Sequence, residues 1–129
     1  MNIAPPSLRE FVQTAKSGGF DTPTAKERWH RLARRVAKAL AKRMGLEPSE
    51  YDIRYNRGGI LVSGDTYLHT TGLYVDLSIS CLGPEWGFMY RSCEHRKDFT
   101  GGANRWMKWD ELLDLDAAAA KLDECRSDR

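Results

Sequence analysis

The sequence LYVDLSISC, residues 73–81, decides the fold, because its apolar and polar side chains alternate without interruption. A period of two residues is typical of a β-strand with one buried face and one solvated face. We therefore predict a strand over Leu73–Cys81 whose polar side chains, Tyr74 among them, point to water. The apolar side chains that point into the core are Leu73, Val75, Leu77, Ile79 and Cys81.

Three similar segments flank this strand. They are predicted strands over Tyr51–Arg57, Ile60–His69 and Trp86–Cys93. Glycine lies wherever the chain must turn between them, at Gly58-Gly59, Thr71-Gly72 and Gly83-Pro84. Because connections this short join neighbouring antiparallel strands, the sequence predicts a four-stranded meander.

Helices are predicted before and after the strands in the sequence. The first begins with a capping box of Ser7 and Glu10 and ends at Gly18-Gly19. The last covers Asp110 to about Cys125, with Asp116 as a candidate cap.

The second N-terminal helix has the longest apolar stripe in the chain, between a capping box of Thr24 and Glu27 and a terminal Gly45. The residues expected to form one core with strand 73–81 are Trp29, Leu32, Val36, Leu40, Val75, Leu77 and Ile79. The predicted fold is a single α+β domain over residues 1–129. It has two N-terminal helices, a four-stranded antiparallel meander and a C-terminal helix packed on one sheet face.

Composition sets the broad class. The chain has 129 residues, of which 41% are hydrophobic and 29% charged, as in ordinary globular domains. It has no apolar run of about 20 residues and no secretory signal pattern, so neither a membrane span nor secretion is expected. Three cysteines without paired spacing do not form a disulfide framework. A reducing cytoplasm is the expected location.

Charge is distributed unevenly, although the net charge is only +2. Residues 25–43 contain eight lysines and arginines against one acid, Glu27, whereas residues 110–128 are strongly acidic. The two segments either attract each other within the molecule or contact separate partners. A basic helix face suits a phosphate backbone, but a solvated amphipathic helix shows the same pattern.

The second face of the sheet and the loop after it carry most other polar candidates. Tyrosines mixed with fixed charges suit a protein-binding surface, although an antiparallel sheet also leaves one face in water by default. Residues 92–105 form a long charged loop rich in glycine, and such loops are often functional.

Candidate chemistry is sparse. Metal ligands are conceivable at His69, Cys81, Cys93, His95 and Cys125, but zinc sites use two close pairs and only Cys93 and His95 are close. A cysteine and a histidine two residues apart are a poor nucleophile–base pair, since they share a strand face without touching. The glycine-rich Lys97–Gly102 lacks the strand–loop–helix setting of a P-loop, which leaves only an anion contact open there. No catalytic residue, metal or cofactor is predicted.

Four short segments in the predicted sheet and the loop after it form a pattern: residues 53–60 (IRYNRGGI), 62–64 (VSG), 73–75 (LYV) and 96–104 (RKDFTGGAN). This part of the chain, about half of it, resembles small accessory proteins encoded on bacteriophages and plasmids. The resemblance implies a setting in which small proteins often bind and redirect a host protein, including host defence complexes. It implies no role for an individual residue.

Three functional hypotheses follow. The leading one is a non-catalytic interaction protein of a mobile genetic element that binds a host or phage protein through the polar sheet face and residues 91–104. Its expected contacts are Arg54, Tyr67, Tyr74, Asp76, Arg91, His95, Arg96, Lys97 and Asp98. The alternative is a nucleic-acid-binding accessory protein that uses Arg28, Arg31, Arg35, Lys38 and Lys42. A small enzyme ranks third, and the oligomeric state stays open.

Overall fold

The computed structural model describes residues 3–56, 64–79, 83–95 and 102–127. Within these residues the chain forms one antiparallel sheet of five strands in the order β1-β2-β3-β4-β5. Their bounds are Tyr51–Asn56 (β1), Asp65–Thr70 (β2), Leu73–Asp76 (β3), Phe88–Arg91 (β4) and Arg105–Met107 (β5). Each strand pairs with its predecessor in the sequence, so the predicted meander is confirmed.

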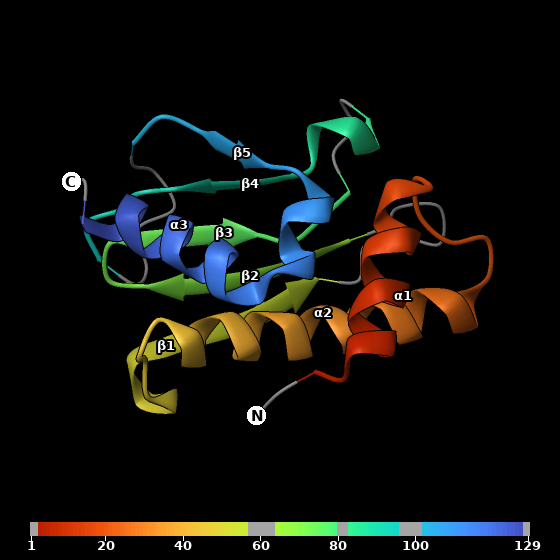
Figure 1. Cartoon of the computed structure of the whole chain (residues 1–129), viewed down its shortest axis with the longest axis horizontal. Coiled ribbons are helices and arrows are strands. Elements are labelled where there is room, and N and C mark those ends of the chain that lie inside the picture. Colours follow the sequence, from red (N-terminus) through yellow and green to blue (C-terminus); the bar gives the residue numbers. More distant parts are fainter. Residues whose placement is uncertain (1–2, 57–63, 80–82, 96–101, 128–129) are drawn as a thin grey trace.

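Helices form the second layer. Within the described residues the α-helices are α1 (Pro5–Lys16), α2 (Pro23–Arg43) and α3 (Leu115–Ser127), and 3-10 turns occupy Pro48–Glu50, Pro84–Trp86 and Trp109–Leu113. The α-helices gather on one side of the sheet (Figure 1). The α+β class with two N-terminal helices is confirmed. None of the helices described is both long enough and apolar enough to cross a membrane.

The core lies between these two layers. The rings of Phe11 and Trp29 stack with their centroids 5.0 Å apart, and Trp109 meets Phe11 edge-on at 5.7 Å. The predicted core is confirmed, since six of its seven members are buried and Ile79 is partly buried against them. The apolar stripe of α2 and the inner side chains of residues 73–79 therefore belong to one core, in which α2 packs on β1 and β2 while α3 packs on β3.

The sheet has one strand more than the sequence predicted. β5 pairs with β4 through Phe88 opposite Met107 and Met89 opposite Trp106. Its three residues are too few to display a period of two, so the pattern does not reveal it. Gly87, with a φ of 78°, allows the two strands to approach, because a Cβ there would lie 1.8 Å from the carbonyl oxygen of Met107.

The observed strands are shorter than predicted. β3 ends at Asp76 rather than at Cys81. β4 cannot begin at Trp86, because the N–H of Trp86 closes a turn on the carbonyl of Gly83 before Gly87 adopts its positive φ. Residues 57–63 and 80–82, which include the predicted Gly58-Gly59 turn, lie outside the described residues.

The N-cap of α2 is Thr22, two residues before the predicted cap at Thr24. The hydroxyl of Thr22 accepts from the N–H of Ala25 at 3.1 Å, and Pro23 is the first helical residue. Proline suits that position because it has no N–H to leave unsatisfied and its φ is already helical. The capping box of Thr24 and Glu27 was therefore a wrong prediction.

The other two helix starts are also displaced. α1 begins at Pro5 with no side-chain cap, so Ser7 lies inside its first turn. At α3 the side chain of Asp114, rather than Asp116, accepts from the N–H of Ala117 at 3.1 Å. At α1 the first residue is a proline, which has no N–H group that needs a partner. At α3 the preceding carboxylate accepts a hydrogen bond from one of the free N–H groups of the first turn.

Candidate functional site

Four cationic side chains form a row along the solvent side of α2. They are Arg31, Arg35, Lys38 and Lys42, and all of them are exposed. Spacings of four, three and four residues keep them within about 60° around the helix axis. Within the described part of the chain, no ion pair or hydrogen bond engages any of the four side chains. We call these four residues the basic row.

Three other cations of α2 interact with side chains of neighbouring elements. Arg28 pairs with Glu10 of α1, which lowers the pKa of that carboxyl, and Arg43 pairs with Asp116 at 3.0 Å. Arg34 is half-buried over an aromatic ring of β1, 4.5 Å from its centroid. Of the five residues expected to contact nucleic acid, Arg28 therefore has a carboxylate partner, whereas the basic row has none among the described residues.

The acidic C-terminal segment pairs with cations outside the basic row. These pairs are Lys16–Asp110, Arg43–Asp116, Lys121–Glu111 and Arg126–Asp123. The basic and acidic segments thus attract each other within the molecule at Arg43 and Asp116, which was one of the two possibilities that the charge pattern left open. The row itself keeps its charge.

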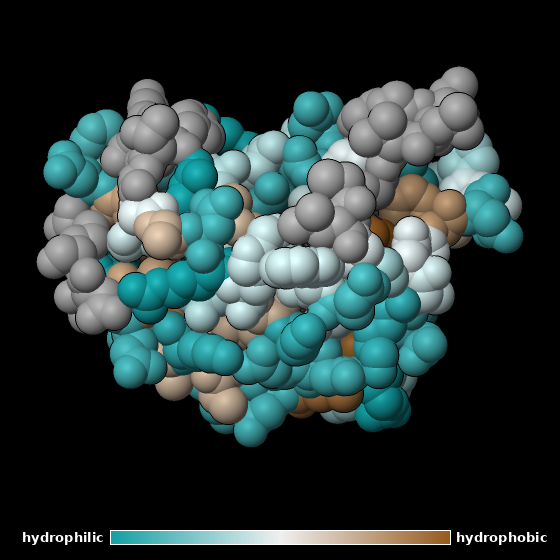
Figure 2. Space-filling view, turned by 90° about the horizontal axis from the view of Figure 1, so that it is seen from above, coloured by the Kyte–Doolittle hydropathy of each residue, from teal (hydrophilic) through white to brown (hydrophobic). Residues whose placement is uncertain are grey.

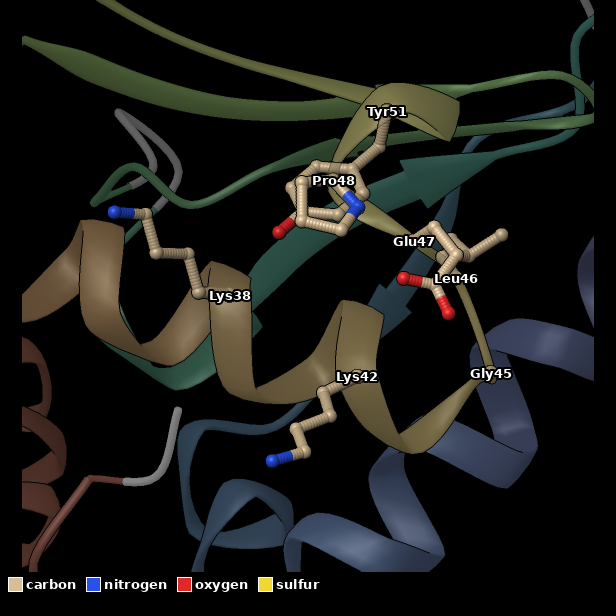
Figure 3. A pocket seen from close by; sticks show the side chains of 7 residues that line it. All are labelled: Lys38, Lys42, Gly45, Leu46, Glu47, Pro48 and Tyr51. Carbon is tan, nitrogen blue, oxygen red and sulfur yellow. The ribbon is translucent and has the colours of Figure 1, made fainter.

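A pocket of about 500 Å³ opens where the row ends. The two lysines of its wall, Lys38 and Lys42, are also the last two members of the basic row. Its other lining residues are Gly45, Leu46, Glu47, Pro48 and Tyr51. Figure 3 shows the lysines leaving successive turns of α2, with Pro48 and the ring of Tyr51 across the hollow from them.

The end of α2 shapes this pocket. Gly45 has a φ of 78°, and the N–H groups of Gly45 and Leu46 donate to the carbonyls of Lys42 and Ala41. This is the Schellman arrangement that glycine permits, so the predicted helix end at Gly45 is confirmed. The chain then reverses through a 3-10 turn, in which Glu47 and Glu50 cap each other's backbone N–H groups. Tyr51, the first residue of β1, follows this turn directly and lines the pocket.

The opposite face of the sheet carries the second group of candidates. Register places Arg54 opposite Tyr67, Tyr67 opposite Asp76, and Tyr74 opposite Arg91, and no helix of the described residues packs on this side. We call these five residues the polar sheet face. The Tyr67 and Tyr74 rings are 5.5 Å apart, and the Arg91 guanidinium lies 4.8 Å from the Tyr74 ring.

Asp76, the carboxyl of the polar sheet face, has a strongly raised pKa. Burial, together with the nearby charge of Asp65, raises its pKa to about 7, against the opposing effects of Ser78 and Arg91. Burial also raises the pKa of Tyr74 to about 12, and that of Tyr67 beyond its ordinary range. The hydroxyl of Tyr67 donates to Asp65 at 2.7 Å. These groups form one interacting cluster.

The polar sheet face is less open than the sequence suggested. Tyr74 is only 6% exposed, so the expectation that it points to water is wrong. It lies in a central strand between the rings of Tyr67 and His69 and under Arg91, which leaves little of it accessible. His95 is exposed, and Arg96, Lys97 and Asp98 lie outside the described residues.

Cys93 contacts a different histidine from the one two residues away. Its sulfur lies 3.5 Å from Nε2 of His69, and the two residues are 2% and 1% exposed. A substrate cannot reach a pair buried to this degree, so the contact does not constitute a nucleophile site. Among the described residues, no three His, Cys, Asp or Glu side chains gather in a way that could hold a metal ion.

The edge of the sheet at β5 carries a pair of tryptophan rings among mainly hydrophilic residues. Seen from that side, the residues that carry a hydropathy colour are mainly hydrophilic, with hydrophobic ones in small separate areas (Figure 2). Trp86 and Trp106 meet there with their ring centroids 5.5 Å apart.

Sequence reasoning missed the pocket and the contact between Cys93 and His69. Both depend on residues that tertiary folding brings together, and neither leaves a spacing in the sequence. Pro48, soon after the helix-ending Gly45, was the available sign that the chain reverses against α2. Comparison of the chain with protein-family models, curated proteins and solved structures finds no match.

Proposed function

We propose that this protein binds nucleic acid through the basic row. The observation that carries the proposal is that four exposed cations lie in line while Asp110, Glu111 and Asp116 of the acidic C-terminal segment pair with other cations. Arg31 and Lys42 are eleven residues apart, which is about 16 Å along the helix. Duplex DNA carries about one phosphate charge per 1.7 Å of its axis, so a row of this length can place each of its four cations near a phosphate.

Two features favour this role over that of an ordinary solvated helix. Solvated helix faces usually carry both positive and negative side chains, because i,i+4 pairs of opposite charge stabilise the helix. Here Glu27 is the only acid in residues 25–43, and it lies before the row begins. Like charges one turn apart cost helix stability, and a polyanionic partner offsets that cost.

The test is the salt dependence of binding to a fluorescein-labelled duplex of about 12 base pairs, followed by anisotropy. Four phosphate contacts predict a slope of about −3.6 in log K against log salt, or about 150-fold weaker binding between about 50 and 200 mM. The variant Arg31→Gln, Arg35→Gln, Lys38→Gln should reduce the slope to about −0.9.

A charge-matched control separates the row from net charge. Arg9, Lys16 and Lys121 are exposed and lie off the row, so changing all three to glutamine removes the same charge. We expect this control to keep a steep slope. No binding to DNA or RNA at low salt, or equal losses in both variants, would contradict the proposal.

Protein binding is the second candidate function. Its support is the polar sheet face, where Arg54 lies opposite Tyr67, Arg91 lies over Tyr74, and no helix of the described residues packs, since tyrosine and arginine are enriched at interfaces. A setting on a mobile genetic element, with a host or phage protein as the partner, belongs to this candidate. It ranks below nucleic acid because Tyr74 is nearly buried.

A further inference from the structure

We propose that the pocket at the end of the basic row takes one unpaired base, so that the protein binds single strands in preference to duplexes. The inference rests on the proposed nucleic-acid function and adds its substrate class. It starts from continuity, because Lys38 and Lys42 belong both to the row and to the pocket wall. A strand whose phosphates follow the row therefore arrives at the pocket.

The walls of the pocket suit the parts of a nucleotide. Tyr51 presents an aromatic ring, and Leu46 and Pro48 add apolar surface beside it. Bases stack on such rings without regard to sequence. A hollow of about 500 Å³ falls within the ordinary range for small-molecule sites, which is about 300–1,000 Å³.

The charges in the pocket favour a base over a phosphate at its inner wall. Glu47 lines the pocket, and the C-terminal end of α2 carries the negative pole of the helix dipole. Both repel a phosphate, whereas both complement the amino groups of a base, which donate to carboxylates. Phosphates are thus expected on the lysines and the base beneath them, against Tyr51.

A duplex cannot use this arrangement. Its bases are stacked and paired inside, so a base can lie against Tyr51 only after its pair has been broken. The phosphates of a duplex remain available to the row. The prediction is therefore a difference between single-stranded and duplex binding that depends on Tyr51 alone.

The experiment compares Tyr51→Leu with Tyr51→Phe by anisotropy, on a labelled single strand of about 12 nucleotides and on its duplex. Loss of one stack predicts about 5- to 150-fold weaker single-strand binding for Tyr51→Leu. Tyr51→Phe should bind like the wild type, and the duplex affinity should not change. Tyr55→Leu is the matched control, because Tyr55 is an exposed tyrosine of the same strand that does not line the pocket.

A second measurement guards against a variant that folds poorly. In wild-type protein labelled with ¹⁵N, the single strand should shift the backbone amides of residues 45–51 (proline excepted), and the duplex should leave them in place. Equal effects of Tyr51→Leu on both oligonucleotides, or unshifted amides with the single strand, would overturn the pocket. Cytidine monophosphate that binds as tightly as the strand would overturn the proposal that the row and the pocket bind one strand together, because the row would then contribute nothing.

The outcomes distinguish this inference from the function on which it rests. Salt-sensitive binding that is equal for single strand and duplex keeps the basic row and removes the pocket. Absence of any binding at low salt removes both.

Discussion

Replacing Asp76 with asparagine should remove a pH dependence of stability that the polar sheet face creates. Burial and the charge of Asp65 raise the pKa of Asp76 from its ordinary 3.8 to about 7. The folded protein therefore holds this proton more tightly than the unfolded chain does. Protonation stabilises the fold fully below about pH 3.8, and this contribution is lost as the pH rises through about 7.

The size of the effect follows from the two pKa values. A difference of about three pH units, at about 1.36 kcal/mol per unit, corresponds to about 4 kcal/mol. Asp76 keeps some contact with water, which screens its charge, so we expect about 2 to 4 kcal/mol. Above pH 7 the cost is constant, because Asp76 is ionised in both states.

The measurement is the free energy of unfolding from urea titrations between about pH 4 and pH 8. Relative to Asp76→Asn, the wild type should lose about 2 to 4 kcal/mol over this range. Asp21→Asn, an exposed aspartate in the connection before α2, is the control and should follow the wild type. If the curves of wild type and Asp76→Asn run parallel, the desolvation argument is wrong.

Two further predictions concern the core and the protein-binding candidate. Leu77 is 0% exposed, so Leu77→Ala should cost about 2–5 kcal/mol in urea unfolding, whereas Leu113→Ala, at a position 49% exposed, should cost within about 0.5 kcal/mol. An unchanged midpoint for Leu77→Ala would contradict the place of Leu77 in the core. For the second function, changing Arg96, Lys97 and Asp98 to alanine should leave folding intact and abolish capture of a protein partner by the tagged protein. Capture at the wild-type yield would show that this loop only connects two strands.

The sequence predicted the parts of the fold that repeat locally. The stripe of α2 and the alternation of Leu73, Val75 and Leu77 extend over enough residues to define a face, so the core and the meander could be derived. β5 could not, since its pairing depends on the close approach at Gly87. Asp76 was expected on the polar face, but its raised pKa depends on Asp65 of the neighbouring strand and on the depth of burial.

Each candidate site also combines features that the sequence reveals with features that only the fold creates. The basic row is a local pattern of one helix, so the sequence contained Arg31, Arg35 and Lys38 as a group. That no described carboxylate pairs with the row is a tertiary property, decided by where Glu10 and the acids of the C-terminal segment lie in the fold. The pocket adds Tyr51, whose position against Lys42 is set by the turn that begins at Gly45.

The arrangement of the two candidate surfaces makes the two functions separable. The basic row lies on the outer side of the helical layer, and the polar sheet face lies on the side of the sheet away from the helices. A partner on one surface does not cover the other, so each set of substitutions should affect one kind of binding. A row variant that loses nucleic acid and captured protein together would mean that nucleic acid bridges the two. Nuclease treatment of the wild type should then release the protein as well, whereas a protein held directly by the polar sheet face should stay bound.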